Sequence, residues 1–361
     1  MLPTQTKERD LLGQFLAALR SLPDVHAELE PERAAAPDYD AGLTLEVAGK
    51  PIYALVEVRN VVYPRDVREF VWRIRGLSRQ QPAGESGGEI LAVLIADSIS
   101  PGAKELLRAE RIGYYDSGGS LYLSARGAYV YIDKPPPKSL SRSIRSLFTG
   151  RRAQVLHGLL IRHKEWFGVK DLAELTRVSP ATASQVLTEM ERLDWLDTRG
   201  QGPSKQRHLR EPAALLDAWV KQLDSIRLPP LRRYFVPALK SEALMVRLSQ
   251  VCEARGVEYT VSFEAAAQRY APFLSMVSQV RCRLLAGAGA DAAIADLGAR
   301  VVSEGANLVV SETDSSGELL FRERVGGVWL ASPIQVYLDL LRGEGRAKEM
   351  AEHLRKERIG F

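Results

Sequence analysis

The chain has 361 residues, a length at which two or three domains can each bury a hydrophobic core. No run of about 18 apolar residues predicts a membrane span, and the first residues lack the order of a secretory signal, so we expect a cytoplasmic protein with no membrane partner. Cys252 and Cys282 are too few for a disulfide framework or a cysteine-rich zinc site, and both are predicted to be core residues.

The net charge of +4 favours anionic partners only weakly, but the basic residues are unevenly distributed. Residues 134–164 and 198–210 contain no Asp or Glu, and they flank one compact segment. Their basic residues are Lys134, Lys138, Arg142, Arg145, Arg151, Arg152, Arg162 and Lys164, followed by Arg199, Lys205, Arg207 and Arg210. Flanks of this kind favour contact with phosphate.

Two proline-containing breaks divide the chain. YIDKPPPKSLSRSIRSLFTG (131–150) has the composition of an extended polyproline linker, and in RLPPLRRY (227–234) the two prolines end the preceding helix. The predicted parts are residues 1–133, a basic Pro-rich linker at 134–149, and domains at 150–228 and 229–361.

In the first domain, apolar spacing predicts a helix within residues 5–22, and LTLEVAGKPIYALVEVRN (43–60) predicts two strands around a turn at Gly49-Lys50-Pro51. The elements expected next are a helix (67–77), a buried strand (89–97), a helix (101–113) and a pair of strands (within 114–133). Helices interspersed with strands around an apolar strand predict an α/β sandwich, a sheet covered on both faces.

The second strand of the hairpin carries Glu57-Val58-Arg59, one side chain away from the acid-x-Lys triplet of metal-dependent nucleases. Glu57 and Arg59 point to the same face of the strand, and Asp38 or Asp40 is expected beside Glu57. In a nuclease, Asp40 and Glu57 would hold Mg²⁺, but Arg59 stays protonated and cannot act as a base. From the triplet alone, a solvent-facing Glu57–Arg59 pair is the favoured alternative.

The order helix, strand, strand, helix, strand across residues 5–96 resembles the core of the PD-(D/E)XK restriction-endonuclease-like fold, with PDYD (37–40) and EVR (57–59) in the places of its motif. The resemblance implies that fold, and in an active enzyme it implies roles for Asp38, Asp40, Glu57 and Arg59. Because Arg59 replaces the lysine, we expect an inactive domain and no cofactor, with Mg²⁺ bound only if the site cuts DNA.

The middle domain contains WFGVKDLAELTRVSPATASQVLTEMERLDWLDTRGQGPSKQRHL (166–209), which predicts a helix, a turn, a second helix and a hairpin. Ser179 is the expected N-cap and Pro180 the first residue of the second helix. The predicted buried stripe of this helix is Ala183, Val186, Leu187, Met190 and Leu193. Its opposite face is small and polar, as a helix in the major groove requires.

This pattern is typical of a winged helix-turn-helix, with a helical hairpin and a solvated charged face as the alternative. The cap, the wing and the acid-free flanks together favour double-stranded DNA as the partner, and we expect a homodimer because winged helices commonly act in pairs. The residues expected on the DNA-facing side of the helix are Thr182, Ser184, Gln185, Thr188 and Arg192. The residues expected to contact phosphate are Arg199, Lys205, Arg207, Arg151 and Arg152.

The third domain is predicted to be α/β, with helices in residues 240–256, 264–271 and 291–298 and two more within 332–358. Strands are expected at 258–263, 279–286, 307–312 and 318–323. GAGAD (287–291) lacks the Lys and Ser/Thr of a P-loop. A nucleotidyltransferase-like enzyme is least favoured, because Asp314 and Glu318 lie in a polar loop instead of forming a carboxylate cluster.

Several segments of the chain resemble the AbiEi-like antitoxins of type IV toxin-antitoxin systems. Besides the winged-helix segment, they are GYYDSGGSLYL (113–123), LFTGRRAQVLHGLL (147–160), YTVSFEAAAQRYAP (259–272) and VWLASPIQVYLDLLRGEGRAKEMAEHL (328–354). The resemblance implies a transcriptional regulator that binds promoter DNA and has an antitoxin-like C-terminal domain for a toxin partner. We therefore expect a non-enzymatic DNA-binding regulator, with an endonuclease or remnant nuclease targeted by the winged helix as the alternative.

Overall fold

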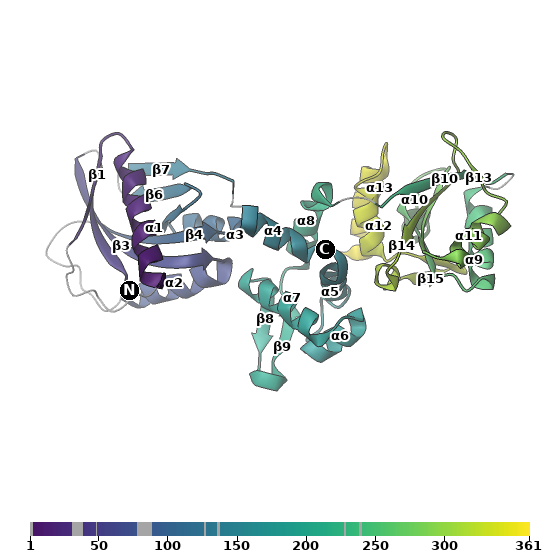
Figure 1. Cartoon of the computed structure of the whole chain (residues 1–361), viewed down its shortest axis with the longest axis horizontal. Helices are drawn as coiled ribbons and strands as arrows, with labels where there is room; N and C mark the ends of the chain where they lie inside the picture. The colour runs from purple at the N-terminus through teal and green to yellow at the C-terminus, as the bar shows by residue number, and fades with distance from the viewer. Residues whose placement is uncertain are drawn as a thin grey trace. The chain divides into compact units, whose positions relative to one another are not determined.

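A computed structural model of the chain describes residues 3–30, 39–47, 49–77, 89–125, 128–135, 138–226, 229–237 and 240–361. It divides into two compact units, Met1–Ile144 with Thr188–Trp195, and Arg145–Leu187 with Leu196–Phe361. Both units combine helices with a large mixed sheet, which confirms the predicted multidomain α/β class (Figure 1). No helix in the described ranges is long and apolar enough to cross a membrane.

The sheet of the first unit has seven strands among its described residues, and their spatial order is their order in the sequence. They are β1 (Val25–Leu29), β2 (Ala41–Val47), β3 (Lys50–Val62), β4 (Glu89–Ile99), β5 (Gly113–Asp116), β6 (Leu121–Ala125) and β7 (Ala128–Ile132). β3, β4 and β5 are parallel to one another, whereas the outer neighbours pair antiparallel. The predicted hairpin is β2–β3, which turns at Gly49 with a φ of 74°.

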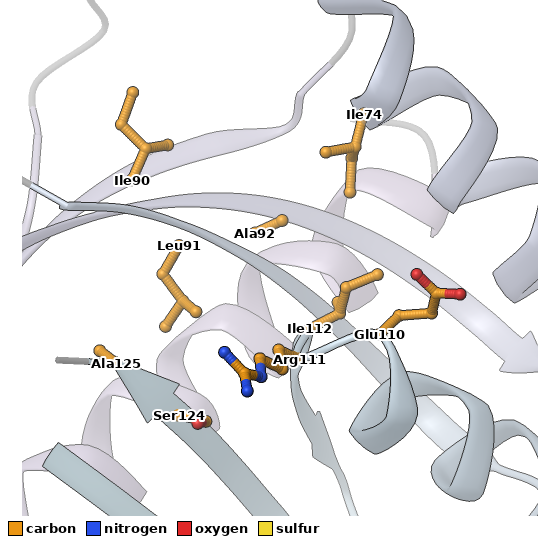
Figure 2. A pocket seen from close by; sticks show the side chains of 9 residues that line it. All are labelled: Ile74, Ile90, Leu91, Ala92, Glu110, Arg111, Ile112, Ser124 and Ala125. Carbon is orange, nitrogen blue, oxygen red and sulfur yellow. The ribbon is translucent and has the colours of Figure 1, made fainter. Parts of the chain in front are cut away.

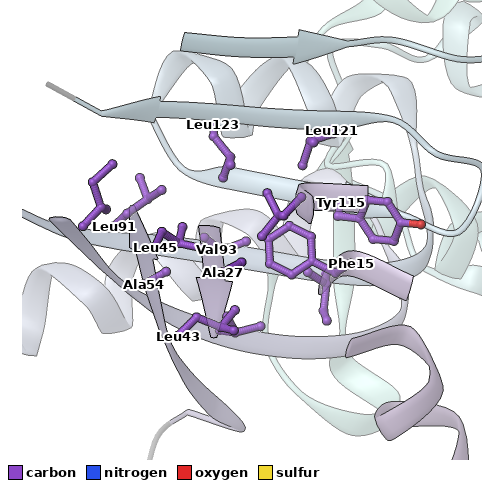
Figure 3. Packing of buried hydrophobic residues seen from close by; sticks show 14 of the residues in the cluster. Phe15, Ala27, Leu43, Leu45, Ala54, Leu91, Val93, Tyr115, Leu121 and Leu123 are labelled. Atoms are coloured by element: carbon purple, nitrogen blue, oxygen red, sulfur yellow. The ribbon is translucent and has the colours of Figure 1, made fainter. Parts of the chain in front are cut away.

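Helices cover both faces of this sheet, as predicted (Figure 1). On one face, α1 (Pro3–Arg20) buries Phe15 against a cluster that includes Leu43, Val93 and Tyr115, and Figure 3 shows this packing. On the other face lie α2 (Pro64–Leu77) and α3 (Pro101–Ala109), whose Phe70 and Leu107 pack in a second cluster with Leu94. The alternation of β4 residues between the two clusters explains why its sequence is apolar throughout.

Two expectations for this part of the chain are wrong. The predicted pair of strands after α3 is a set of three, because β5 is a short strand fully buried between β4 and β6. The predicted extended linker contains a helix, α4 (Lys138–Leu147), whose last residue Leu147 is buried, as is Phe148 directly after it. The burial of these two residues at the C-terminal end of α4 offsets the low helix propensity of its serines. The strand β1 was not predicted, since only Val25 and Ala27 in it are buried.

A buried ion pair holds α3 against the turn between β5 and β6. The Lys104 ammonium lies 2.8 Å from the Asp116 carboxylate and donates a hydrogen bond of 2.6 Å to the Ser120 hydroxyl. Asp116 also accepts a hydrogen bond from the backbone N–H of Ser120, and Gly119 between them has a φ of 87°. The polar residues of DSGGS (116–120) therefore have a structural explanation within this turn.

A helical segment with a hairpin follows, and it belongs to the second unit except for Thr188–Trp195, which are part of the first. Its elements are α5 (Gly150–Ile161), α6 (Val169–Thr176), α7 (Pro180–Arg192), β8 (Leu196–Arg199), β9 (Gln206–Leu209) and α8 (Pro212–Val220). The helix–turn–helix–hairpin order of residues 166–209 is the predicted one. A 3-10 turn, η1 (Gly202–Ser204), forms the tip between the two strands, where Gly200 and Gly202 have positive φ.

A second large sheet follows, with the order β13-β10-β14-β12-β11-β16-β15. Its strands are β10 (Leu231–Phe235), β11 (Tyr259–Ser262), β12 (Val280–Leu285), β13 (Arg300–Val301), β14 (Leu308–Thr313), β15 (Glu323–Val325) and β16 (Val328–Leu330). The accompanying helices are α9 (Ser241–Ala254), α10 (Phe263–Tyr270), α11 (Ala288–Asp296), α12 (Pro333–Leu340) and α13 (Ala347–Leu354). Cys252 and Cys282 are buried, as predicted.

The strand expected at 318–323 is wrong. Residues Ser316–Leu319 form a 3-10 turn, η3, and a hairpin of β15 and β16 follows it. Gly326 and Gly327 form the turn of this hairpin with φ values of 56° and 80°, and two adjacent residues with positive φ are typical of a two-residue hairpin turn. The apolar run of ELLFRE suggested a strand, whereas the diglycine that follows fixes where the chain reverses.

A buried histidine joins α5 to α12 within the second unit. The Nε2 atom of His157 lies 2.6 Å from the Ser332 hydroxyl, which also accepts a hydrogen bond from the backbone of Gln335 and so caps α12. The imidazole ring packs 4.9 Å from the ring of Phe321. Burial lowers the pKa of His157 from 6.5 to about 4, because there the charged form loses its hydration.

We expect His157 to make the second unit sensitive to acid. Below pH 6.5 the unfolded chain binds a proton that the folded chain does not bind until about pH 4. Stability is therefore fully present above pH 6.5 and falls as the pH drops towards 4, by about 3 kcal/mol at most. Urea unfolding of His157→Gln at several pH values should show a smaller loss than the parent over this range. His163→Gln is the control, and an identical pH dependence of His157→Gln and the parent would contradict the expectation.

Candidate functional site

Glu57 is the centre of a charge cluster on β3. Its side chain is buried, and the Nη2 atom of Arg73 in α2 donates to both carboxylate oxygens at 2.7 Å. Arg59 forms a second ion pair with Glu57 from the same strand, and 46% of the Arg59 side chain is exposed. The alternative of a solvent-facing pair is therefore wrong for Glu57, whose carboxylate lies beneath two guanidinium groups.

Asp40 lies beside this cluster, next to the start of β2. Its backbone N–H donates to the carbonyl of Val56, and its carboxylate accepts a hydrogen bond of 2.7 Å from the N–H of Val58. The structure thus brings Asp40 to the strand that bears Glu57, as the sequence predicted. Asp38 lies outside the described residues.

The chemistry of this cluster differs from that of a metal-binding pair of carboxylates. Magnesium needs free carboxylate oxygens, whereas both oxygens of Glu57 accept hydrogen bonds from Arg73, and Asp40 binds the backbone of Val58. Within the described ranges, no three side chains of His, Cys, Asp or Glu are grouped to hold a metal ion. The sequence did not identify Arg73, because its contact with Glu57 joins residues 16 positions apart.

Removing Arg73 should show how much of the stability of the fold depends on its ion pair with the buried carboxylate of Glu57. Arg73→Met leaves Glu57 with Arg59 alone, and we expect a loss of about 1–3 kcal/mol in the free energy of unfolding, below the cost of a fully unpaired buried charge. Adding Glu57→Gln to Arg73→Met should recover much of this loss in a double-mutant cycle measured by urea unfolding.

The matched control is Arg75→Met on the same helix. Arg75 pairs with Glu110 at 2.6 Å but is 69% exposed, so its removal should cost less than about 1 kcal/mol. Equal losses for Arg73→Met and Arg75→Met would show that Glu57 does not depend on Arg73.

The predicted recognition helix is α7, and its N-terminus forms as expected. The Ser179 hydroxyl accepts a hydrogen bond of 3.1 Å from the N–H of Thr182, and Pro180 is the first helical residue. The apolar stripe of the helix is fully buried at Ala183, Val186, Leu187 and Met190. Leu193 lies beyond the end of the helix and is half-buried.

The polar residues of α7 differ in their environments. Gln185, Thr188 and Arg192 are exposed, whereas Thr182 and Ser184 are half-buried. The Thr182 hydroxyl lies 2.9 Å from that of Ser179, so it takes part in capping the helix. Gln185 makes no side-chain hydrogen bond with another described residue, and its amide is the strongest candidate on this helix for contact with a base.

The basic residues near the hairpin also separate into two groups. Arg199 is exposed on β8, where its guanidinium lies 4.3 Å from the centre of the Trp166 ring and donates to Gln206, and Arg151 is exposed on α5. Lys205 and Arg152 are half-buried, and Arg152 donates to the Ser146 hydroxyl. Arg207 is buried and its backbone bridges to Phe167, and this burial counts against the predicted phosphate contact.

A hollow with a volume of about 480 Å³ lies in the first unit (Figure 2). Ile74 of α2 and Ile90 and Leu91 of β4 line it together with Ser124 and Ala125 of β6. The charged residues of its lining are Glu110 and Arg111. Residues 78–88 and 126–127, which adjoin this lining in the chain, lie outside the described residues.

Comparisons of the chain with protein-family models, with curated proteins and with solved structures gave no match.

Proposed function

We propose that the protein is a DNA-binding transcriptional regulator in which residues 150–228 act as a winged helix on double-stranded DNA. The observation that carries the proposal is the division of α7 into two faces. Its apolar stripe is buried completely, while Gln185 is exposed on a different side of the same helix. A capped helix with an exposed amide near its N-terminus can present hydrogen-bonding groups to base edges in the major groove.

The hairpin after α7 supplies the electrostatic part of the proposal. Arg199 is exposed at the end of β8, and the tip formed by residues 200–204 is exposed throughout. The ring of Trp166 and the amide of Gln206 hold the Arg199 guanidinium near the tip, which reduces the entropy lost when it contacts a phosphate. Arg151 on α5 is a second exposed cation of this segment.

In this proposal the first unit has a restriction-endonuclease-like core that does not cut DNA. Arg73 and Arg59 neutralise Glu57, so the carboxylate of the motif supports the sheet instead of binding Mg²⁺. The adjacency of Asp40 and Glu57 favours an endonuclease as the second candidate function. The role of antitoxin, with residues 229–361 binding a toxin, extends the proposal on the strength of the sequence resemblance.

The DNA-binding proposal predicts different defects for two variants. Duplexes would first be selected from a randomised library by the full-length protein, and binding would be measured over a salt series. Gln185→Ala should reduce the preference for the selected duplex by about 1–3 kcal/mol and leave the salt dependence unchanged, because an amide reads bases. Arg199→Gln should weaken binding to all duplexes and lower the salt slope by about 1, because it removes one phosphate contact.

Arg300→Gln serves as the control, since Arg300 is an exposed arginine on β13 of the same unit. It should bind DNA as the parent does. If Gln185→Ala and Arg199→Gln both match the parent, residues 166–209 do not contact DNA in the proposed way.

A cleavage assay separates the regulator from the endonuclease. Supercoiled plasmid incubated with the purified protein and Mg²⁺ or Mn²⁺ should stay intact, because the carboxylate oxygens of Glu57 are bound by Arg73. Nicking by the parent that disappears in Glu57→Gln would establish the endonuclease and overturn the non-enzymatic part of the proposal. Circular dichroism of Glu57→Gln would verify that the variant is folded.

A further inference from the structure

β7 is an outer strand of the first sheet, and β6 is the one strand that pairs with it among the described residues (Figure 1). Its sequence is Ala-Tyr-Val-Tyr-Ile (128–132). It contains no charged residue and no proline, although natural proteins commonly use both to prevent an outer strand from pairing with another chain. The uncharged strand is therefore a surface on which a further strand can pair.

The other outer strands of the two large sheets are charged, short or both. β1 carries the exposed Glu28, and β15 carries Glu323 and Arg324 in a strand of three residues. β13 has two residues, of which Arg300 is charged. Within the described ranges, β7 thus differs from the other outer strands of these sheets in having neither device against pairing.

The hydrogen-bonding pattern of the first sheet shows which backbone groups of β7 are on its open side. The N–H of Asp116 donates to the carbonyl of Ser120, so the backbone groups of Tyr122, two residues further along, are also turned towards β5. The neighbours of Tyr122 in the sequence join β6 to β7. The same alternation turns the N–H and carbonyl groups of Tyr129 and Tyr131 to the open side, where no described residue bonds them.

The two tyrosines are accessible, and β7 is held in position behind them. Tyr129 is 69% exposed and Tyr131 is 41% exposed, and both rings pack edge-on against the buried ring of Tyr122. The other face of β7 carries Val130 and Ile132, which pack against the core of the unit. A partner strand would therefore meet backbone groups that are already ordered, which reduces the entropy lost on binding.

We propose that two copies of the chain pair through β7, antiparallel and about a two-fold axis at Val130. In this register Tyr129 of each copy lies opposite Tyr131 of the other copy. The outward N–H and carbonyl groups of the two strands then form four hydrogen bonds, with none of these groups left over. The tyrosine side chains form two cross-strand aromatic pairs on one face, and such pairs stabilise antiparallel strands.

A second copy suits this strand because the outward groups are placed symmetrically about Val130, so the strand is complementary to itself. Two-fold contacts require such self-complementarity, and β7 brings no like charges together at the axis. The expected homodimer thereby obtains an interface in the first unit. The pairing does not depend on the proposed DNA-binding function.

A cysteine cross-link tests the register. Val130 and its copy would form a non-hydrogen-bonded pair with about 4.5 Å between their Cα atoms, a separation that a disulfide can bridge. Oxidised glutathione should therefore convert most of full-length Val130→Cys into a covalent dimer on a non-reducing gel. Ile132→Cys is the control on the same face, because its two copies would be roughly 13 Å apart along the strands and should not cross-link. The native cysteines are buried and are common to both variants.

Sedimentation velocity tests the association without a cross-link. The full-length parent should show a reversible monomer–dimer equilibrium over a concentration series. Tyr131→Pro removes the outward N–H of each copy, and thus two of the four hydrogen bonds, while the bonds to β6 remain. Dimerisation should weaken about ten-fold or more. Circular dichroism would verify that the variant is folded.

Leu29→Pro in β1 is the matched control, because it changes the opposite edge of the same sheet. The N–H of Glu30 donates to Gly42 in β2, so the N–H of Leu29 is on the open side of β1. This variant should dimerise as the parent does. The proposal is overturned if the parent is monomeric at every concentration, which would assign β7 to a different partner. It is also overturned if folded Tyr131→Pro dimerises as tightly as the parent, or if Ile132→Cys cross-links as readily as Val130→Cys.

Discussion

The parallel pairing of β3 with β4 is the constraint from which the charge cluster of the first unit follows. Parallel neighbours cannot be joined by a tight turn, so the chain must cross one face of the sheet before β4 begins. That crossing contains α2, and its apolar side, with Phe70, packs on the sheet. The same placement brings Arg73 to Glu57, and a carboxylate that would be costly to bury alone is thereby neutralised.

The second sheet also contains parallel neighbours joined by a connection with a helix, but its arginines have different partners. β12 and β14 are parallel, and α11 lies in the connection between them. The alternation of β12 sends Cys282 and Leu284 into the core on the side of α9, and Arg281 and Arg283 to the other face. No described residue accepts a hydrogen bond from the Nε atom of Arg283, and the carboxylates of Glu318 and Asp339 lie 3.8 and 3.7 Å from its nitrogen atoms. Arg73 in the first unit, in contrast, donates to both carboxylate oxygens of Glu57. A helix that crosses the sheet thus supplies the arginine that neutralises Glu57, whereas strand alternation places Arg283 beside carboxylates that it does not reach at hydrogen-bond distance.

Local signals in the sequence predicted the parts of the structure that depend on neighbouring residues. Ser179 and Pro180 start α7, and the spacing of Ala183, Val186 and Leu187 gives its buried stripe, because these features are fixed within a few turns of helix. Contacts between distant segments were beyond such signals. The pairing of Arg73 with Glu57 and the bridge of Arg207 to Phe167 depend on how elements pack. The strand expected over ELLFRE failed because an apolar run does not by itself distinguish a strand from a turn.

The basic residues of the chain differ in their environments, and these environments decide which of them are accessible to an anionic partner. A net charge of +4 counts every arginine equally. In the structure, Arg73 neutralises a buried carboxylate and Arg207 is itself buried, so neither is placed to attract a phosphate from solvent. Arg199 is exposed and oriented by Trp166. Among residues of one type, those that keep donors accessible to solvent are the ones that can bind a partner, because such a donor exchanges water for an anion without breaking a buried ion pair of the fold.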